Sequence, residues 1–332
     1  MAKVVITDFI TGELDLEREI LGESVEILAA EARSEAELEG QVEDADALLV
    51  YHFIELTTRT IARLERCKLI VRCGVGVDNV DWRAAAERGI PVANVPDYGT
   101  EEVADSAIGH MLGFLRGIHF LNSRLRRGIG DWSHAQVAPL RRVRGLTLGI
   151  VGLGRIGSAT ALRAKALGMR VLFYDPYVAD GVDKSLGVER IEELYLLLCH
   201  SDVLSLHCPG GEGTEGMIDA PAISAMKPGA YLINTARGSV VDADDLLDAI
   251  ESGQLAGAAI DVLPTEPPIG DEPLITAWRN PDHPAHDKLI INPHAAFYSE
   301  QGLDDMRIKG SQNCARVLRG EAPRNVVNGV TA

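Results

Sequence analysis

The sequence predicts an α/β protein built from two Rossmann-like, doubly wound domains. Its 332 residues exceed the roughly 250–300 residues at which a single hydrophobic core stops growing, which favours two domains. Short apolar segments of β type alternate with amphipathic helical segments, a pattern typical of parallel sheets that are covered on both faces. This alternation occurs twice, once before and once after a long helical segment at residues 101–127.

The first alternating set extends from Lys3 to Val95 and predicts a flavodoxin-like domain with about five parallel strands. Each expected strand leads into a segment that can cover one face of the sheet. We expect helices near residues 14–21, 35–42, 57–64 and 80–88, and strands at KVVITD, SVEILA, ALLVY, LIVRCG and PVANV.

The segment at residues 101–127 is predicted as one long helix, apolar for much of its length and basic at its end. Such a helix could bridge two domains or form part of a dimer interface. Its large apolar surface favours burial between subunits.

The second alternating set predicts a six-stranded sheet made of two mononucleotide-binding halves of three strands each. A closing helix is expected at about residues 299–318. The six strands are expected at LTLGIV, RVLFYD, DVLSLHC, AYLINTA, AGAAIDV and KLIINPH.

Composition narrows the function classes. The chain has 32 Lys+Arg against 49 Asp+Glu, a formal net charge of −17 that repels nucleic acids and anionic lipid surfaces. No window offers the ~20 apolar residues of a membrane helix, and the start MAKVVITDF lacks the regions of a signal peptide. We therefore expect a soluble, cytoplasmic protein with no direct nucleic-acid binding and no membrane contact. The five cysteines have no CxxC spacing, which favours reduced thiols over disulfides or a metal site.

A glycine motif, GLGRIG, follows the expected strand LTLGIV and opens a helix. Gly152 can make the tight turn, Gly154 lets the backbone approach a pyrophosphate, and Gly157 permits close packing of helix and strand. The helix beginning at Arg155 and Ile156 offers unpaired N–H groups and the positive end of its dipole to a diphosphate. The motif alone is weak evidence in a chain with 33 glycines, so its position between strand and helix decides the interpretation.

An acidic residue is expected about 20 residues after such a motif, and Asp175 ends the next strand, in VLFYDP. Its carboxylate can accept hydrogen bonds from the adenosine ribose hydroxyls and would repel a 2′-phosphate. The sequence therefore predicts NAD rather than NADP. The alternative is a plain glycine turn with a capping aspartate.

Three loops follow the last three expected strands, at the sheet edge where ligands of such folds bind. They contain Arg237, Glu266 and His294. This set suits reduction of a 2-oxo acid, because a guanidinium can hold the carboxylate and the carbonyl oxygen on which charge develops. The imidazole can donate the proton, and a neighbouring carboxylate would orient it and favour its protonated form.

Each of these three residues also has a structural interpretation. Arg237 could cap strand carbonyls or pair with Asp242, His294 could be a structural histidine, and Glu266 could be an exposed loop acid. Their convergence on the cofactor edge favours catalysis.

A second basic residue, Arg72, ends a strand of the first domain in VRCGVGVDNVD. Exposed N–H groups around Val75 and Gly76 can form an anion-binding nest for a substrate carboxylate. The alternative is a glycine-rich turn with a surface arginine.

With these residues in place, the sequence resembles the D-isomer-specific 2-hydroxyacid dehydrogenases, most closely their C-terminal binding protein branch. The resemblance covers nearly the whole chain in the family's order. It rests on YHFIELT, IVRCGVGVDNVD, EEVADS, RGLTLGIVGLGRIG, RAKALGMRVLFYDPYVADGVDKSLGV, SLHC, LINTARGSVVD and NPHAAFYSEQ.

The resemblance implies a substrate domain built from residues 1–98 and 296–332, an NAD domain at 99–295, and a homodimer formed through the NAD domain. It implies catalytic roles for the arginine, glutamate and histidine named above. It also implies that Asp261 binds the nicotinamide amide and that Thr100 lies near the cofactor. Tyr51, His52 and Phe297 would line the substrate pocket, with His52 open to a purely structural role.

Two departures from the branch stand out. Phe297 replaces the usual tryptophan, which predicts a roomier pocket without an indole N–H. The segment between Glu266 and His294 is longer than expected and could act as a lid or a dimer contact. It contains His283 and His286, whose spacing resembles a metal pair, but no third ligand is evident and we expect no metal.

The sequence leaves two functions open. The first is an NAD-dependent dehydrogenase that interconverts a 2-oxo acid and a D-2-hydroxy acid; the second is an NAD(H)-sensing, corepressor-like protein with little or no turnover. An L-specific lactate or malate dehydrogenase is disfavoured because its glycine motif lies at the N-terminus. Glyoxylate, hydroxypyruvate, phosphorylated or phosphonate acids and bulkier oxo acids all fit the pattern.

Overall fold

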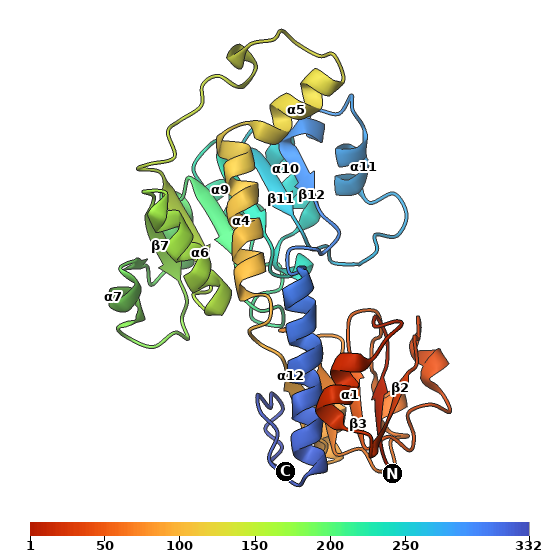
Figure 1. The fold of residues 1–332 in the computed structure, drawn as a ribbon. Helices are drawn as coiled ribbons and strands as arrows, with labels where there is room; N and C mark the ends of the chain where they lie inside the picture. Colours follow the sequence, from red (N-terminus) through yellow and green to blue (C-terminus); the bar gives the residue numbers. More distant parts are fainter. Residues whose placement is uncertain (332) are drawn as a thin grey trace. The chain divides into compact units, whose positions relative to one another are not determined.

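The computed structural model describes residues 1–331 and divides the chain into two compact units (Figure 1). Unit 1 comprises Met1–Gly99 and Tyr298–Ala332, and unit 2 comprises Thr100–Phe297. Within the described residues, no helix combines the length and the apolar character needed to cross a membrane.

Unit 1 contains a five-stranded, fully parallel sheet of order β2-β1-β3-β4-β5. This is the flavodoxin-like arrangement that the sequence predicts. Its interior strands are mostly apolar and buried, as expected for a parallel sheet covered on both faces, and their charged residues lie near strand ends (Lys3 in β1 and Arg72 in β4). The strands are β1 (Ala2–Ile6), β2 (Val25–Ala29), β3 (Ala47–Val50), β4 (Leu69–Arg72) and β5 (Val92–Asn94).

The helices of unit 1 come from both ends of the chain. The C-terminal helix packs on the first one, where the buried carboxylate of Glu17 receives two hydrogen bonds of 2.7 Å from Arg307. The tail continues to an antiparallel bridge between Val326 and Ala93, which covers the β5 edge. The helices are α1 (Asp15–Leu21), a 3-10 turn at Glu35–Leu38, α2 (Thr58–Ile61), α3 (Trp82–Glu87) and α12 (Glu300–Leu318).

Unit 2 contains a seven-stranded parallel sheet of order β12-β11-β10-β9-β6-β7-β8. The six-strand prediction was one strand short, because Glu189–Arg190 pairs with β7 as an edge strand. Two charged residues carry no apolar signal that sequence reasoning could detect. The loops that contain Arg237, Glu266 and His294 therefore follow the fifth, sixth and seventh strands. The strands are β6 (Thr147–Val151), β7 (Arg170–Tyr174), β8 (Glu189–Arg190), β9 (Val203–Leu206), β10 (Ala230–Asn234), β11 (Leu255–Ile260) and β12 (Leu289–Ile291).

The long helix predicted at residues 101–127 is two helices, α4 (Thr100–Leu115) and α5 (Ile118–Arg126), which meet at Gly117 with φ 62°. The apolar side of α4 packs inside unit 2, where the Phe114 ring stacks on Tyr231 at 5.1 Å. In contrast, α5 buries none of its residues. The buried residues of α4 are therefore covered within the unit, and burial of the remaining surface between subunits stays a prediction.

The other helices of unit 2 cover the two faces of its sheet (Figure 1). They are α6 (Arg155–Ala166), α7 (Val182–Leu186), α8 (Leu194–His200), α9 (Ala220–Ala225), α10 (Ala243–Glu251) and α11 (Pro273–Arg279), with 3-10 turns at His134–Val137, Gly238–Val240 and His286–Lys288.

Candidate active site

The glycine motif forms the turn from β6 into α6. Gly152 has φ 89°, and a β-carbon there would lie 2.8 Å from the Cys208 nitrogen. A β-carbon at Gly157 would lie 2.1 Å from the Gly152 oxygen. Gly154 differs: it caps α6, and nothing lies within 4 Å of its β-carbon position. The two outer glycines are thus required by the protein's own packing, whereas the middle one leaves open space before a helix N-terminus, as a diphosphate needs.

Asp175 lies directly after β7 and fixes this turn. Its Oδ2 accepts a 2.8 Å bond from the Leu153 N–H, and its Oδ1 accepts bonds from the N–H groups of Tyr177 (2.9 Å) and Val178 (3.2 Å). A carboxylate has about four acceptor positions, so capacity for a further hydrogen bond remains. An anionic side chain here fits ribose hydroxyls and disfavours a 2′-phosphate.

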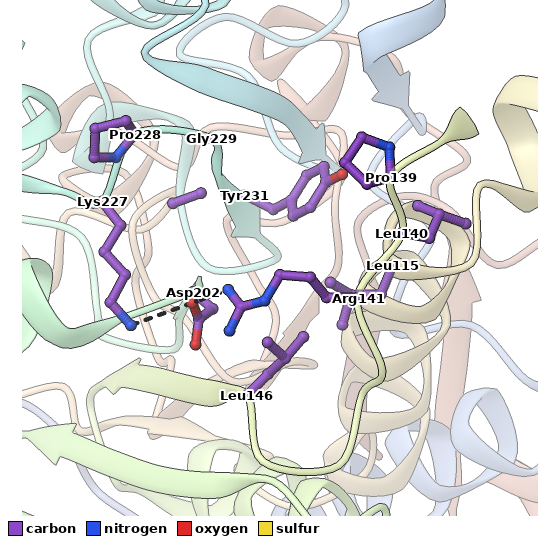
Figure 2. A pocket seen from close by; sticks show the side chains of 11 residues that line it. Leu115, Pro139, Leu140, Arg141, Leu146, Asp202, Lys227, Pro228, Gly229 and Tyr231 are labelled. Atoms are coloured by element: carbon purple, nitrogen blue, oxygen red, sulfur yellow. Dashed lines mark hydrogen bonds and ion pairs between the residues drawn. The ribbon is translucent and has the colours of Figure 1, made fainter. Parts of the chain in front are cut away.

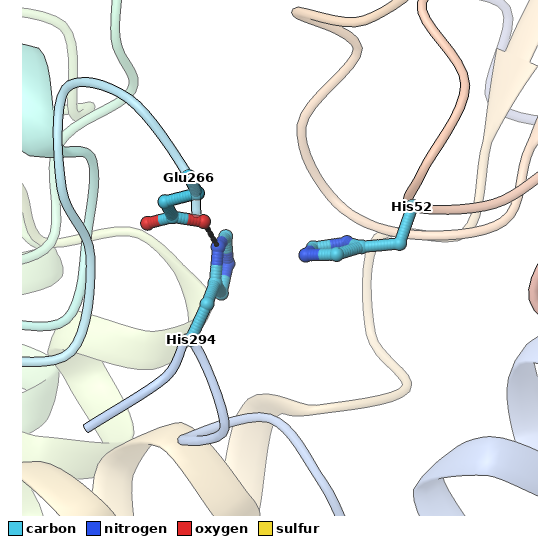
Figure 3. Close-up of side chains that lie close together, drawn as sticks. All are labelled: His52, Glu266 and His294. Carbon is cyan, nitrogen blue, oxygen red and sulfur yellow. Dashed lines mark hydrogen bonds and ion pairs between the residues drawn. The ribbon is translucent and has the colours of Figure 1, made fainter. Parts of the chain in front are cut away.

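His294 and Glu266 form a hydrogen-bonded pair (Figure 3). The imidazole Nδ1 lies 2.6 Å from the glutamate Oε2, and the glutamate Oε1 accepts a 2.6 Å bond from the Leu263 N–H. Both side chains are partly exposed, at 26% and 29%. The glutamate is thus held by the backbone and in turn fixes the orientation of the imidazole.

The backbone at His294 is in the left-handed region, with φ 51°, a conformation that costs a non-glycine residue of order 1–3 kcal/mol. Asp261, which is 2% exposed and follows β11, holds it there. The Asp261 carbonyl accepts the His294 N–H at 2.7 Å, and its carboxylate accepts the N–H groups of Ala295 (2.9 Å) and Ala296 (3.0 Å). Asp261 therefore positions the histidine loop; its expected contact with the nicotinamide amide stays a prediction.

Arg237 lies in the loop after β10. The side chain of Asn234 folds this loop, because it accepts the Ala236 N–H at 3.0 Å and donates to the Arg237 carbonyl at 2.9 Å. The next residue, Gly238, packs so closely that a β-carbon would lie 2.0 Å from the backbone carbon of Leu263. The arginine loop and the glutamate loop are thus in backbone contact, and the glutamate bonds to the histidine of the third loop.

In unit 1, Arg72 ends β4 and lies against the glycine turn that follows. A β-carbon at Gly74 would lie 1.4 Å from the Arg72 Nη1. A glycine at this position therefore leaves the space that the guanidinium occupies. The Arg72 Nε donates to Asn79 Oδ1 at 3.2 Å. Asn94 Nδ2 donates to the Val75 carbonyl at 2.6 Å, which fixes the turn that includes Gly76. The structure thus brings the predicted guanidinium and the predicted nest together.

Tyr51 and His52 follow β3 in unit 1. The Tyr51 ring is 1% exposed and stacks on Phe9 at 5.8 Å, while His52 is partly exposed. Asp8 orders this segment, since its carboxylate accepts the N–H groups of Tyr51 (2.9 Å) and Phe53 (2.5 Å). Contact of the two predicted side chains with a substrate stays a prediction, and the burial of Tyr51 limits what its ring can reach.

Two predicted residues lie at the boundaries of unit 2. Thr100 begins α4. Phe297 is the last residue of the unit, and its ring meets the His294 imidazole edge-on, with centroids 6.1 Å apart and an interplanar angle of 79°. Phe297 therefore lies beside the proposed acid–base residue.

Comparison with known proteins settles the family. The profile described as "D-isomer specific 2-hydroxyacid dehydrogenase, NAD binding domain" matches residues 108–296, more than half of the chain. The chain belongs to the D-isomer-specific 2-hydroxyacid dehydrogenases. The family resemblance predicted from the sequence is thereby confirmed, and the cofactor is NAD.

Among the relatives of this chain is D-3-phosphoglycerate dehydrogenase of Methanocaldococcus jannaschii, 36% identical over 99% of this chain and 60% of the relative. C-terminal-binding protein 1 of Caenorhabditis elegans is 33% identical over 95% of this chain and 43% of the relative. The chain thus spans about half the length of these curated relatives. The crystal structure of D-lactate dehydrogenase from Aquifex aeolicus with NAD and lactic acid has a TM-score of 0.83 and 30% identity, with 96% of each chain covered.

The long segment before His294 is anchored over much of its length, and its role as a lid or a dimer contact stays a prediction. Residues 273–279 form α11, whose Leu274 is buried, and Ala285 is fully buried. His283 Nε2 lies 3.1 Å from Glu251, and His286 Nδ1 lies 2.6 Å from the Trp278 carbonyl. Both histidines therefore have partners within the protein.

Sequence reasoning missed the segment after β9, which joins the glycine turn to the arginine. A β-carbon at Gly152 would lie 2.8 Å from the Cys208 nitrogen, and a β-carbon at Gly210 would lie 3.0 Å from the Arg237 Cγ. His207 lies here too, but burial lowers its pKa to about 4 and its Nδ1 has no hydrogen-bond partner among the described residues. It is neutral near pH 7 and cannot replace His294 as an acid. The sequence offered one signal for this segment: it follows an expected strand of the cofactor sheet, as the three predicted loops do.

Proposed function

We propose that this protein is an NAD-dependent dehydrogenase that interconverts a 2-oxo acid and a D-2-hydroxy acid. The observation that carries the proposal is the 2.6 Å bond between His294 Nδ1 and Glu266 Oε2, on loops at the carboxyl edge of an NAD-binding sheet. Such a pair can present a proton donor in a fixed orientation beside a hydride carrier. Family membership supports the reaction class.

When bound, the nicotinamide supplies or accepts the hydride. In the reductive direction, His294 Nε2 would donate its proton to the carbonyl oxygen of the substrate, which would become the hydroxyl group of the product. Glu266 holds the imidazole and stabilises its positive charge before the transfer. Arg237 binds the substrate carboxylate and the oxygen on which charge develops. The reverse reaction uses neutral His294 as the base.

The cofactor is proposed to lie along the glycine turn. The N–H groups at Arg155 and Ile156 face the diphosphate, and Asp175 binds the ribose. Asp261 and Thr100 lie nearer the nicotinamide. The open space at Gly154 supports this placement.

Unit 1 is proposed to hold the substrate. Arg72 and the Val75–Gly76 backbone bind its carboxylate, with Tyr51, His52 and Phe297 as pocket residues. Phe297 lies edge-on to His294, so its size should influence which side chain of the acid fits.

We propose a homodimer formed through unit 2 and working in the cytoplasm. The supporting observation is surface that unit 2 leaves unburied: α5 has no buried residue, Ile118 is 60% exposed and Trp132 is 91% exposed.

A second candidate is an NAD(H)-sensing protein with little turnover, favoured by the 33% identity to C-terminal-binding protein 1. Mixing the protein with NADH and a panel of 2-oxo acids separates the two functions. Loss of reduced-nicotinamide absorbance that depends on Arg237 and His294 supports the enzyme. NADH binding without turnover on any acid supports the sensor and contradicts the enzyme.

A further inference from the structure

A second cavity of unit 2 lies at the opposite, amino-terminal edge of its sheet (Figure 2). It is bounded by residues that precede or begin three strands: Leu146 before β6, Asp202 before β9, and Ala230 and Tyr231 in β10. The carboxyl ends of the same strands carry the glycine turn, the Cys208 segment and the arginine loop. This cavity is therefore separate from the candidate active site. Leu115, Pro139, Leu140, Arg141, Lys227, Pro228 and Gly229 complete its lining.

The cavity has the size and the walls of a small organic ligand site. Its volume is about 170 Å³, close to the ~150 Å³ of an apolar cavity that binds benzene. The half-buried ring of Tyr231, stacked on Phe114, forms one wall, and Leu115 and Leu146 are buried beside it. An occupant of roughly benzene size would thus contact mostly carbon on these sides.

The polar side of the cavity carries a net positive charge. Arg141 Nη1 and Lys227 Nζ share one oxygen of Asp202, at 2.8 Å and 3.2 Å, while the other oxygen accepts the Thr147 N–H at 2.8 Å. Burial acts to raise the pKa of Asp202, but these hydrogen bonds outweigh it, so its pKa lies below the usual value and the group is anionic near neutral pH.

Two cations and one carboxylate leave one positive charge in a chain whose formal net charge is −17. A guanidinium has five N–H donors and an ammonium has three, so both retain donors for a ligand. We propose that this cavity binds a small aromatic or branched monocarboxylate, with its carboxylate between Arg141 and Lys227 and its apolar part against Tyr231.

Benzoate is the probe, and its binding to the whole protein is followed by calorimetry. Arg141→Gln and Lys227→Gln should each weaken benzoate about five- to ten-fold, through loss of one charged hydrogen bond. Asp202→Asn should tighten it, because the internal competitor for the two cations is removed. Arg142→Gln is the matched control: it removes the same charge from the neighbouring exposed residue, which does not line the cavity.

A variant of Arg237 distinguishes binding in this cavity from binding in the candidate active site. Benzoate affinity that survives Arg237→Gln but falls in Arg141→Gln supports the second site. Affinity that falls in Arg237→Gln and is unchanged in Arg141→Gln and Lys227→Gln overturns it, as does the absence of measurable binding. Thermal melting of each variant shows that it is folded, and the tighter binding expected of Asp202→Asn cannot arise from unfolding.

Discussion

Two histidines of unit 2 follow strands of the same sheet, yet their hydrogen-bond partners differ. His294 is 26% exposed on its side chain and bonds to Glu266 at 2.6 Å. His207 is also partly exposed as a residue, but its Nδ1 is buried, its Nε2 lies 2.9 Å from the Ser205 hydroxyl, and desolvation lowers its pKa to about 4. Position at the cofactor edge therefore does not by itself single out the proposed acid–base residue; the carboxylate partner distinguishes His294 from His207.

The largest expected effect comes from removing the paired histidine. His294→Gln should lower kcat by about a thousand-fold, within the 10²–10⁴ range of general acid–base catalysis, while NADH affinity stays within two- to three-fold. Steady-state kinetics and NADH fluorescence titration measure the two quantities. The matched variant His207→Gln should keep kcat within a few-fold of the unsubstituted protein. Equal losses of kcat in both variants would contradict the different roles of the two histidines.

The next largest effect is expected from changing Glu266, the hydrogen-bond partner of His294. Glu266→Gln keeps the shape of the side chain but not its charge, so the imidazole loses the group that stabilises its protonated form. We expect kcat to fall about a hundred-fold with a smaller change in KM, and Glu266→Asp to recover part of it. A change confined to KM would mean that Glu266 acts only in binding.

The difference between the two histidines should also appear in the pH dependence of the free energy of unfolding. His207 has a folded-state pKa of about 4 against ~6.5 unfolded, so the unfolded chain binds the extra proton first. The free energy of unfolding should therefore fall as the pH drops from about 6.5 to 4, by roughly 3 kcal/mol from this residue. Urea unfolding at pH 7 and pH 4.5 measures it. His207→Gln should flatten this part of the profile, and an unaltered slope would contradict the buried, neutral histidine.

The smallest effect concerns the residue beside His294. Phe297→Trp should shift preference toward smaller acids, with a change in discrimination of about 1–3 kcal/mol at most. Ratios of kcat/KM across a series of 2-oxo acids measure it. An unchanged ranking would show that Phe297 does not shape the pocket.

The sequence was sufficient for features that repeat or carry a local pattern. Apolar strands alternating with helices predicted both sheets, and the glycine motif followed by Asp175 predicted the cofactor. It was insufficient for β8, whose two residues are charged, and for the break of the long helix at Gly117. A glycine within an apolar helical pattern does not by itself show where the backbone turns.

The residues that hold the site in place could not be predicted from the sequence either. Asp8, Asn79 and Asn234 are short polar residues near strand ends, and each bonds backbone or side-chain groups of a predicted site segment. Such residues are common in loops, so their importance depends on which backbone groups lie beside them in the folded protein. Gly74 and Gly238 could not be singled out for the same reason. At each position, an atom of another residue lies where a β-carbon would be.

The most direct test of the account is a crystal structure of the protein with NADH and oxamate, an unreactive analogue of a 2-oxo acid. The account predicts the nicotinamide ring at the carboxyl edge of the unit 2 sheet, with oxamate hydrogen-bonded to His294 Nε2 and to the Arg237 guanidinium. Oxamate bound away from both side chains, or a dinucleotide that does not follow the turn at Gly154, would contradict it.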